Sequence, residues 1–490
     1  MSQQTPETHR ILTQEGNSPL PTAHPSHEKL EAIPLDLWGR CGILVLGSFA
    51  SMLTATIVSV ALPTMAQQFG GTRDATQWVT SAFLLGLGMA IPLSSWAASR
   101  FGVTKLWLGC LALFTLISIA CATANSLEYL IGLRLVLGLV GGLMVPAAQM
   151  QVGMLAGPKR AGRVMSVLGV PIILAPAIGV SIGGMLLSRY GWPSLFWINI
   201  PLCVVAGIAG LLWLPRIEKK GDSRFDTLGF VLLAIGLSLL TLGVSAFGHQ
   251  TSGVIGSDAA LFAIGVLFLL TFVSHARRTK QPILKTALLS RPGIVYAGLI
   301  VFAAGFITFG AQIVLPEFYL QVRGYDPDLT GILLLPQAVG MGIGLPTSGW
   351  LTDRHGAGHV VVAGAIVTAL GTVALALFEA SQPDWWFTTV LIVRGFGISM
   401  LSTPGLTKAV SLVDRDDVPN VIPIMNVLNR FGGGLGTALI FMAFQFALAW
   451  SSDPSAALTG FHVAHWVMVA VLLILMVPGF ALARLEKRSV

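Results

Sequence analysis

Four charged side chains stand inside long apolar stretches of this sequence, and their types point to proton and charge chemistry. They are Arg134, Arg394, Arg430 and Glu317. An ionisable group among apolar residues is costly to hold, so it needs a cavity or a partner. A glutamate in such surroundings can exchange a proton near neutral pH, and a nearby arginine can tune that exchange through its charge. We therefore take Arg134, Glu317 and Arg430 as candidates for proton coupling.

Each of these residues also has a purely structural interpretation. Arg134 could bond the carbonyl groups at the end of a neighbouring helix. Arg394 and Arg430 could extend along their helices towards water. Glu317, which follows Pro316, could face water at the end of its stretch. The residue types alone do not decide between these interpretations.

Amide side chains in the same stretches provide hydrogen-bonding groups without charge: Gln149, Gln151, Asn426 and Asn429. Such groups can bind a polar part of a substrate, and they can equally bond neighbouring helices. We take Gln149, Asn426 and Asn429 as candidates for lining a substrate cavity.

The composition places these residues in a membrane protein. Of the 490 residues, 54% are hydrophobic and 10% are charged, whereas a soluble domain carries about a quarter charged residues. The net charge of +7 does not indicate a nucleic-acid binder, because the basic residues fall in short gaps between apolar runs. The four cysteines lie in apolar segments without zinc-site spacing, so we expect buried, reduced thiols, no metal and no cofactor.

The apolar runs are long enough to cross a bilayer as helices, which takes about 20 residues each. Fourteen such runs occur, near 41–63, 76–98, 104–124, 128–155, 162–187, 193–214, 228–248, 256–275, 293–320, 329–350, 359–379, 385–407, 420–450 and 462–483. The sequence thus predicts an all-α integral membrane protein with fourteen transmembrane helices.

Two longer charged connections divide these helices into six, two and six. We expect a disordered cytoplasmic tail (1–40), a six-helix bundle (41–214) and a two-helix linker (215–292). A second six-helix bundle (293–483) and a short cytoplasmic end (484–490) follow. The tail is polar and has no apolar core, so it does not read as a signal peptide.

The basic residues give the orientation. With the N-terminus in the cytoplasm, 23 of the 29 Lys and Arg fall in inner segments and only three in outer ones. Cytoplasmic loops carry such an excess, so we expect both termini in the cytoplasm and the protein in the cell membrane.

The two sets of six helices look like copies of one another. Residues 95–102 follow the second run, and residues 349–356 follow the corresponding run of the last six. Both segments have tryptophan second, arginine sixth and glycine last. Arg134 and Arg394 stand at matching places further along. Parallel six-helix repeats are a transporter architecture.

The segment 349–356 resembles the cytoplasmic signature of the major facilitator superfamily, a family of transporters. The signature reads G-x-L-a-D-R-x-G, and this segment keeps all its fixed residues. The first copy keeps only Arg100 and Gly102, with Ser95 and Ser99 where glycine and aspartate are usual. The resemblance implies that one group of residues controls contact between the bundles: Arg100, Gly102, Gly349, Asp353, Arg354 and Gly356.

Further stretches are similar to the fourteen-helix drug:proton antiporters of that superfamily; they are 53–63, 192–201, 321–336 and 429–438. Thr54 and Ser59 stand where that family has aspartate and asparagine in the first helix, so we count both as cavity candidates. Gly179, Gly183 and Gly184 resemble the antiporter glycines of the fifth helix, where close packing would control which side opens. Plain close packing of two helices is the alternative.

The resemblance implies the major facilitator fold, two six-helix bundles plus two additional helices. It also implies export of small amphipathic compounds, such as drugs or natural products, in exchange for protons. Three embedded arginines against one carboxylate favour neutral or anionic substrates. An importer or uniporter of a small metabolite and a transport-inactive sensor are the alternatives.

An enzyme is disfavoured, because the sequence has no clustered metal ligands, nucleophile elbow or phosphate loop, and we expect no catalytic residues. The expected partners are a small-molecule substrate, protons and the lipid bilayer, with no nucleic acid. A membrane-fusion or outer-membrane efflux partner cannot be identified from these residues.

Overall fold

Every regular element that the structure describes is a helix, as the sequence predicts. The structure is a computed structural model that describes residues 33–157, 160–217, 224–247, 255–379, 382–450 and 456–488. Within these ranges there is no strand. Most of the predicted disordered tail lies outside them, and the first helix begins at Leu35.

Two sets of long helices are joined by a pair that stands between them in the sequence. The first set is α1 (Leu35–Ile57), η1 (Val58–Ala61), α2 (Leu62–Phe69), α3 (Arg73–Phe101), α4 (Val103–Ala122), α5 (Leu127–Ala156), α6 (Ala161–Tyr190), α7 (Ser194–Trp197) and α8 (Asn199–Trp213). The pair is α9 (Thr227–Phe247) and α10 (Ile255–Arg278), followed by η2 (Thr286–Ser290). The second set is α11 (Pro292–Glu317), η3 (Phe318–Val322), α12 (Pro327–His355), α13 (Ala357–Ala376), α14 (Asp384–Ser411), η4 (Arg415–Asp417), α15 (Val418–Trp450) and α16 (Ala456–Arg488).

Among the described residues, twelve helices are long and apolar enough to cross a membrane. The helices α6, of 30 residues, and α9, of 21 residues, are not among the twelve, and several of their side chains lie outside the described residues. The all-α membrane fold is therefore confirmed, while the count of fourteen spans stays a prediction.

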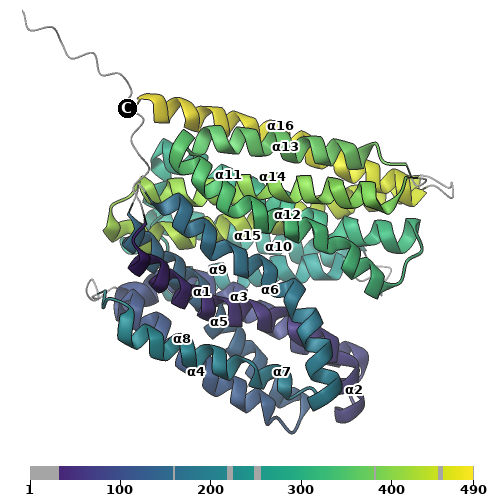
Figure 1. Cartoon of the computed structure of the whole chain (residues 1–490), viewed down its shortest axis with the longest axis horizontal. Helices are drawn as coiled ribbons and strands as arrows, with labels where there is room; N and C mark the ends of the chain where they lie inside the picture. The colour runs from purple at the N-terminus through teal and green to yellow at the C-terminus, as the bar shows by residue number, and fades with distance from the viewer. Residues whose placement is uncertain are drawn as a thin grey trace, which may run out of the picture. The chain divides into compact units, whose positions relative to one another are not determined.

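The helices of the two sets pack in the same pairs. In the first set α3 packs on α5 through Gly138, where a Cβ would meet the backbone of Phe83. In the second set α12 packs on α14 through Gly395, where a Cβ would meet the backbone of Gln337. Figure 1 shows α4, α5 and α8 on one side of the view and α13, α14 and α16 on the other. We call the two sets the first and second bundles.

The repeated signature ends each time in a turn that needs glycine. Gly102 follows α3 with φ +81° and ψ 145°, and Gly356 follows α12 with φ +84° and ψ 154°. Glycine alone adopts this backbone region readily, because any Cβ is strained there. The end of the helices that carries both turns is called the signature end below.

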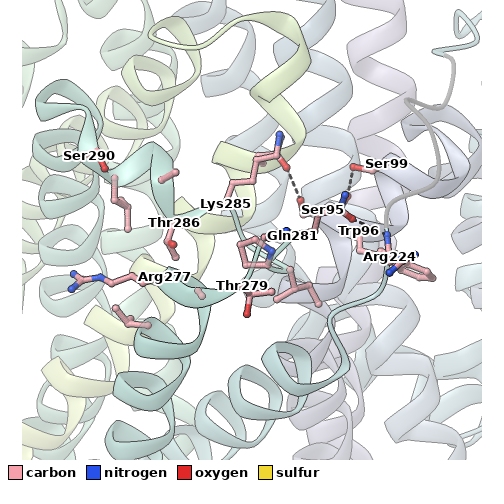
Figure 2. A pocket seen from close by; sticks show the side chains of 18 of the residues that line it. Ser95, Trp96, Ser99, Arg224, Arg277, Thr279, Gln281, Lys285, Thr286 and Ser290 are labelled. Atoms are coloured by element: carbon pink, nitrogen blue, oxygen red, sulfur yellow. Dashed lines mark hydrogen bonds between the residues drawn. The ribbon is translucent and has the colours of Figure 1, made fainter.

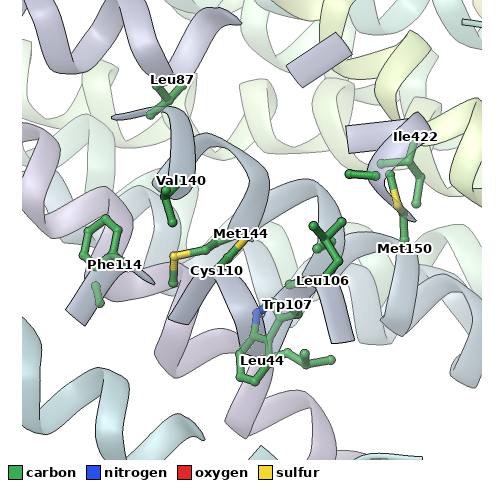
Figure 3. Packing of buried hydrophobic residues seen from close by; sticks show 14 of the residues in the cluster. Leu44, Leu87, Leu106, Trp107, Cys110, Phe114, Val140, Met144, Met150 and Ile422 are labelled. Carbon is green, nitrogen blue, oxygen red and sulfur yellow. The ribbon is translucent and has the colours of Figure 1, made fainter. Parts of the chain in front are cut away.

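An apolar cluster runs through the first bundle and continues into the second. Trp107 of α4 is fully buried, and a Cβ added at Gly47 of α1 would lie 2.7 Å from its ring. Met150 of α5 and Ile422 of α15 are also fully buried and lie side by side (Figure 3). Because Ile422 belongs to the second bundle, the bundles meet here through apolar side chains.

Asp226 holds the linker pair together at its signature end. Its carboxylate accepts hydrogen bonds from the backbone N–H groups of Gly229 at 2.9 Å and Ile283 at 3.2 Å, and it contacts His275 Nε2 of α10 at 2.9 Å. Burial raises the pKa of Asp226, but these hydrogen bonds and the neighbouring His275 outweigh burial and hold the pKa below its ordinary value of 3.8. A carboxylate whose pKa is lowered by folding stabilises the folded chain above its unfolded pKa.

We expect Asp226→Asn to lower the free energy of unfolding by about 0.5–2 kcal/mol near neutral pH, the range for losing a helix cap. The difference from the wild type should shrink below a pH of about 4, as the wild-type carboxylate itself becomes protonated. Thermal unfolding of the purified protein at both pH values tests this. Asp36→Asn is the control, because Asp36 pairs with Arg40 while 68% exposed; an equal effect of both changes would contradict the prediction.

Candidate functional site

A cavity of about 640 Å³ lies between the two bundles. The first bundle contributes side chains from α1, α3, α5 and α6, and the second from α11, α12, α14 and α15. Most of the lining is apolar, with amides, hydroxyls and one guanidinium interspersed. Ligand pockets of about 300–1,000 Å³ hold drug-sized molecules, and an apolar wall with a few polar groups is their usual make-up. We call this space the central cavity.

Four residues predicted from the sequence come together in the central cavity: Gln149, Asn426, Asn429 and Arg430. Asn426 Nδ2 of α15 donates a hydrogen bond to Gln149 Oε1 of α5 at 2.9 Å, which joins the two bundles across the cavity. Asn429 Nδ2 donates to the carbonyl of Val301 in α11 at 3.2 Å. These amides therefore bond neighbouring helices and also face the space where a substrate would lie.

Arg430 is half-buried and lies over the ring of Phe309, with Cζ 5.7 Å from the ring centroid. Both residues line the central cavity. Phe309 belongs to α11 and carries no signal in the sequence that would separate it from other membrane phenylalanines. The contact places a cation on an aromatic face, an arrangement that favours guanidinium groups.

Arg134, the first coupling candidate, is fully buried and does not line the central cavity. Its Nε donates to the carbonyl of Val79 in α3 at 2.9 Å, and one terminal nitrogen donates to the carbonyl of Thr54 in α1 at 3.4 Å. Its Cζ lies 4.3 Å from the ring centroid of Phe83. The arrangement matches the structural interpretation, in which this arginine bonds backbone carbonyls and ties α5 to α1 and α3.

Arg394 occupies the matching place in the second bundle and is also fully buried. Its guanidinium donates to Thr372 Oγ1 at 3.2 Å and to Gln337 Oε1 at 2.8 Å. Gln337 itself lines the central cavity, although sequence reasoning did not select it. Arg394 thus acts on the cavity indirectly, by fixing the side-chain amide of Gln337.

The two candidates in the first helix lie away from the central cavity. Thr54 is fully buried. Its Oγ1 lies 2.8 Å from the carbonyl oxygen of Ala50 and 2.9 Å from Asn199 Oδ1 of α8, both of which are hydrogen-bond acceptors. Ser59 is exposed in η1 and donates to the carbonyl of Thr56 at 2.6 Å. Neither residue is among those that line the cavity.

Glu317 is the last residue of α11 and is half-buried. Its carboxylate accepts a hydrogen bond from Gln321 Nε2. The preceding residue, Pro316, lines the central cavity, whereas Glu317 does not. A carboxylate therefore lies beside the cavity, at the end of the helices opposite the signature end.

An ion pair closes the gap between the bundles at the signature end. Arg163 Nε of α6 lies 2.8 Å from Asp353 Oδ2 of α12, and the side chains are 17% and 4% exposed. The backbone N–H of Arg163 donates to the same oxygen at 3.3 Å. Gly162 and Gly349 allow this approach, since a Cβ on Gly349 would lie 2.5 Å from the carbonyl oxygen of Gly162. In the sequence, Arg163 is one of several basic residues near a loop, and no motif marks it as a bundle contact.

The first copy of the signature also contacts the other bundle, through a hydrogen bond between neutral side chains. Ser95 Oγ of α3 donates to Asn420 Oδ1 of α15 at 3.2 Å, and Ser99 Oγ donates to the carbonyl of Ser95. Arg100, which the resemblance implied in bundle contact, is exposed, and Arg354 lies over the ring of Trp350 with Cζ 5.2 Å from the centroid.

The three candidate glycines of α6 differ in what they face. A Cβ at Gly179 would lie 2.6 Å from Thr56 Oγ1, and one at Gly183 would lie 2.9 Å from Ile57 Cγ1 and 3.0 Å from the Ile57 carbonyl oxygen. A Cβ at Gly184 would meet nothing within 4 Å. Two of the three therefore hold α6 against the end of α1.

A second, larger cavity of about 970 Å³ lies at the signature end, among α3, the end of α10, η2 and the beginning of α15. Figure 2 shows Arg224 and Arg277 on opposite sides of it, with Lys285 between them. Its basic side chains are exposed, and Lys285 pairs with Asp417 at 3.3 Å. We take the central cavity as the candidate site, because side chains of both bundles enclose it and few of its lining residues are exposed.

Comparisons with known proteins agree with this architecture. The chain matches the family described as Major Facilitator Superfamily over residues 44–437 and 297–489. It is 30% identical, over 88% of its length and 82% of the relative, to a multidrug resistance protein B homolog of Mycobacterium tuberculosis. It is 27% identical to the lincomycin resistance protein LmrB of Bacillus subtilis, over 81% of this chain and 83% of that one.

Solved structures resemble the fold at low sequence identity. The human organic anion transporter MFSD10 superposes with a TM-score of 0.64 and 16% identity, over 92% of this chain and all of that one. The proton:xylose symporter XylE superposes with a TM-score of 0.61 and 13% identity, over 89% of this chain and 94% of that one. At these identities the likeness concerns the fold alone.

Proposed function

Because the chain belongs to the Major Facilitator Superfamily, whose members are membrane transporters rather than enzymes, we propose that it exports small amphipathic compounds. Relatives named for multidrug and lincomycin resistance support export of drugs or natural products. The resemblance of Gly179, Gly183 and Gly184 to the antiporter glycines supports the same direction.

The observation that carries this proposal is a drug-sized cavity shared by two repeated bundles and closed at one end by a cross-bundle ion pair. The cavity extends from Met165 and Leu406 towards Pro316 and Gly331, away from the signature end. Transporters of this architecture rock one bundle against the other about a central site. Opening the signature end would require separation of Arg163 from Asp353 and of Ser95 from Asn420.

We place the signature end and both termini in the cytoplasm, in a cell membrane. The reason is the distribution of charge, since 23 of the 29 Lys and Arg belong to segments on that side. In this orientation the ion pair closes the cytoplasmic side, and the cavity belongs to the outward-facing stage of the cycle.

We further propose that export is coupled to proton entry, with Glu317 as the group that binds the proton. It is a half-buried carboxylate beside the cavity on the side where protons would enter. One proton that crosses about 100 mV supplies about 2.3 kcal/mol, enough for roughly fiftyfold accumulation of a neutral solute.

Everted membrane vesicles test export and coupling together. Adding transported compounds to acid-loaded vesicles should release protons, recorded with a pH-sensitive dye. Glu317→Gln should abolish this release while leaving exchange of labelled for unlabelled compound intact. The control is Glu379→Gln, which changes an exposed carboxylate at the same end of the helices. Proton release by Glu317→Gln at the wild-type rate would remove Glu317 from the mechanism, and binding without flux would indicate a sensor.

A further inference from the structure

The central cavity has one charged side chain, and it is positive. Among the described residues that line it, Arg430 is the sole charged group; there is no aspartate, glutamate, lysine or histidine. The half-buried carboxylate of Glu317 lies outside the lining. A cationic compound would therefore find no counter-charge in this cavity.

Arg430 differs from Arg134 and Arg394 in having no hydrogen-bond acceptor among the residues that the structure describes. Arg134 and Arg394 donate to carbonyl, hydroxyl and amide oxygens of neighbouring helices. Arg430 makes no hydrogen bond or ion pair within the described part of the chain, and its guanidinium lies over the face of Phe309. A guanidinium away from bulk water is strongly stabilised by an acid that binds it through paired hydrogen bonds.

A second polar group in the cavity also offers hydrogen-bond donors. Arginine can only donate, so the bond from Arg394 requires that Gln337 present its oxygen to Arg394. The N–H groups of Gln337 Nε2 then remain available to a ligand in the cavity, which Gln337 lines. Arg394 thereby orients Gln337 to donate, which suits an anionic ligand.

We propose that the transported compounds are amphipathic organic monoanions, with a carboxylate or sulfonate group that binds Arg430. The apolar body would lie against Phe309, Met341 and Leu345, which also line the cavity. This inference rests on the proposed function, because it names the class of compound carried by the same site. One arginine balances one negative charge, so monoanions are preferred over dianions and cations.

The charge of the compound also changes the driving force. A monoanion leaving a cell that is negative inside moves down the membrane potential, and about 100 mV favours its export roughly fiftyfold. Export should therefore accelerate when a potassium gradient with valinomycin sets such a potential, even without a pH difference. Export of a neutral analogue in exchange for one proton should accelerate less, because one charge then crosses the membrane instead of two.

The test uses the full-length protein in liposomes and sets of matched compounds. One set is 1-naphthylacetate, 1-naphthylacetamide and 1-naphthylethylamine, which share a ring system and differ in charge; a second set on a biphenyl scaffold guards against a poor fit of one ring. We expect the wild type to bind and carry the carboxylates about tenfold better than the amides, the lower range for a charged hydrogen-bonded pair, and to exclude the amines.

Arg430→Gln should bring the carboxylates down to the level of the amides while amide binding is unchanged, and Arg430→Lys should restore part of the preference. Arg189→Gln, at an exposed site outside the cavity, is the control. Unaltered amide binding also demonstrates that the variant is folded. If Arg430 had only a structural role, its replacement would weaken binding of amides and carboxylates alike.

The outcomes separate this inference from the proposed function. The inference is wrong if amines bind as well as carboxylates, if no anion binds, or if Arg430→Gln keeps the preference for anions. Export itself would still stand in these cases if other compounds cross the membrane. If anions bind through Arg430 but no compound crosses the membrane, the site assignment stands and the proposed export fails.

Discussion

Asp353→Asn is expected to lower transport by about tenfold or more without unfolding the protein. Asp353 is 4% exposed and accepts two hydrogen bonds from Arg163, one from the backbone and one from the guanidinium. Breaking a buried ion pair by removing one partner costs about 3–5 kcal/mol, and the partial exposure of Arg163 reduces that figure. A loss of only about 1.4 kcal/mol from the closed signature end shifts the balance between the two arrangements tenfold.

The shift can be measured with one reporter cysteine. Gln312 lines the cavity and is exposed towards the end opposite the signature, so Gln312→Cys should react quickly with a membrane-impermeant maleimide added outside. Asp353→Asn should slow this reaction, because more molecules would be open to the cytoplasm. The four native cysteines are free and buried, as predicted from the sequence, so their background reaction should be low.

The matched control is Asp417→Asn at the same end of the molecule. Asp417 pairs with Lys285, but these side chains are 27% and 56% exposed. Exposed pairs contribute about 0–1 kcal/mol, so transport and labelling should change less than about fivefold. Unchanged labelling in Asp353→Asn, or an equal effect of both changes, would show that the buried pair does not hold the bundles together.

The fold could be predicted from the sequence because a membrane helix must satisfy its own backbone, which makes each span a continuous apolar run. The repeated signature could also be placed, since its last glycine has a backbone conformation that other residues avoid. Amides within apolar runs are expensive to expose to lipid, and three of them, Gln149, Asn426 and Asn429, do line the central cavity.

The function of each embedded arginine could not be predicted, because it depends on the face of the helix and on the neighbouring helices. Arg134, Arg394 and Arg430 look alike in the sequence, yet only Arg430 lines the cavity. Arg134 bonds α1 and α3 across 80 and 55 residues of sequence, and no local pattern encodes such partners. Each residue of a helix turns the side chain by about 100°, so a small error in rotation exchanges a cavity position for a buried one.

Resemblance alone was also insufficient for Thr54 and Gln337. The resemblance implied a cavity role for Thr54, but its side chain bonds Asn199 of α8, 145 residues away. Gln337 has no motif, and it becomes important only because Arg394 lies close enough to orient it. In both cases the role depends on a side chain from another helix.

Gly183→Leu is expected to reduce transport by about tenfold or more, whereas Gly184→Leu should leave it nearly unchanged. A Cβ at Gly183 would lie 3.0 Å from the carbonyl oxygen of Ile57, the last residue of α1, and the rest of a leucine side chain would force α6 away. A Cβ at Gly184 would meet nothing within 4 Å. The two glycines are adjacent in the chain, so both variants carry the same substitution at nearly the same depth in the membrane.

Helix propensity sharpens this comparison. Leucine stabilises a helix interior relative to glycine by roughly 0.8 kcal/mol, so without tertiary contacts both changes would raise stability. Overpacking at Gly183 costs about 1–3 kcal/mol or more, which reverses the sign at that position only. Thermal unfolding and vesicle transport, measured at equal amounts of inserted protein, should therefore diverge between the two variants.

The divergence distinguishes the two interpretations of this glycine motif. If α6 must stay against the end of α1 for the bundle to move as one body, Gly183→Leu should lose transport even where the protein still inserts and binds substrate. Equal behaviour of the two variants would mean that the contact between α6 and Ile57 has no part in transport. Loss of insertion in Gly183→Leu alone would assign the glycine to plain packing instead.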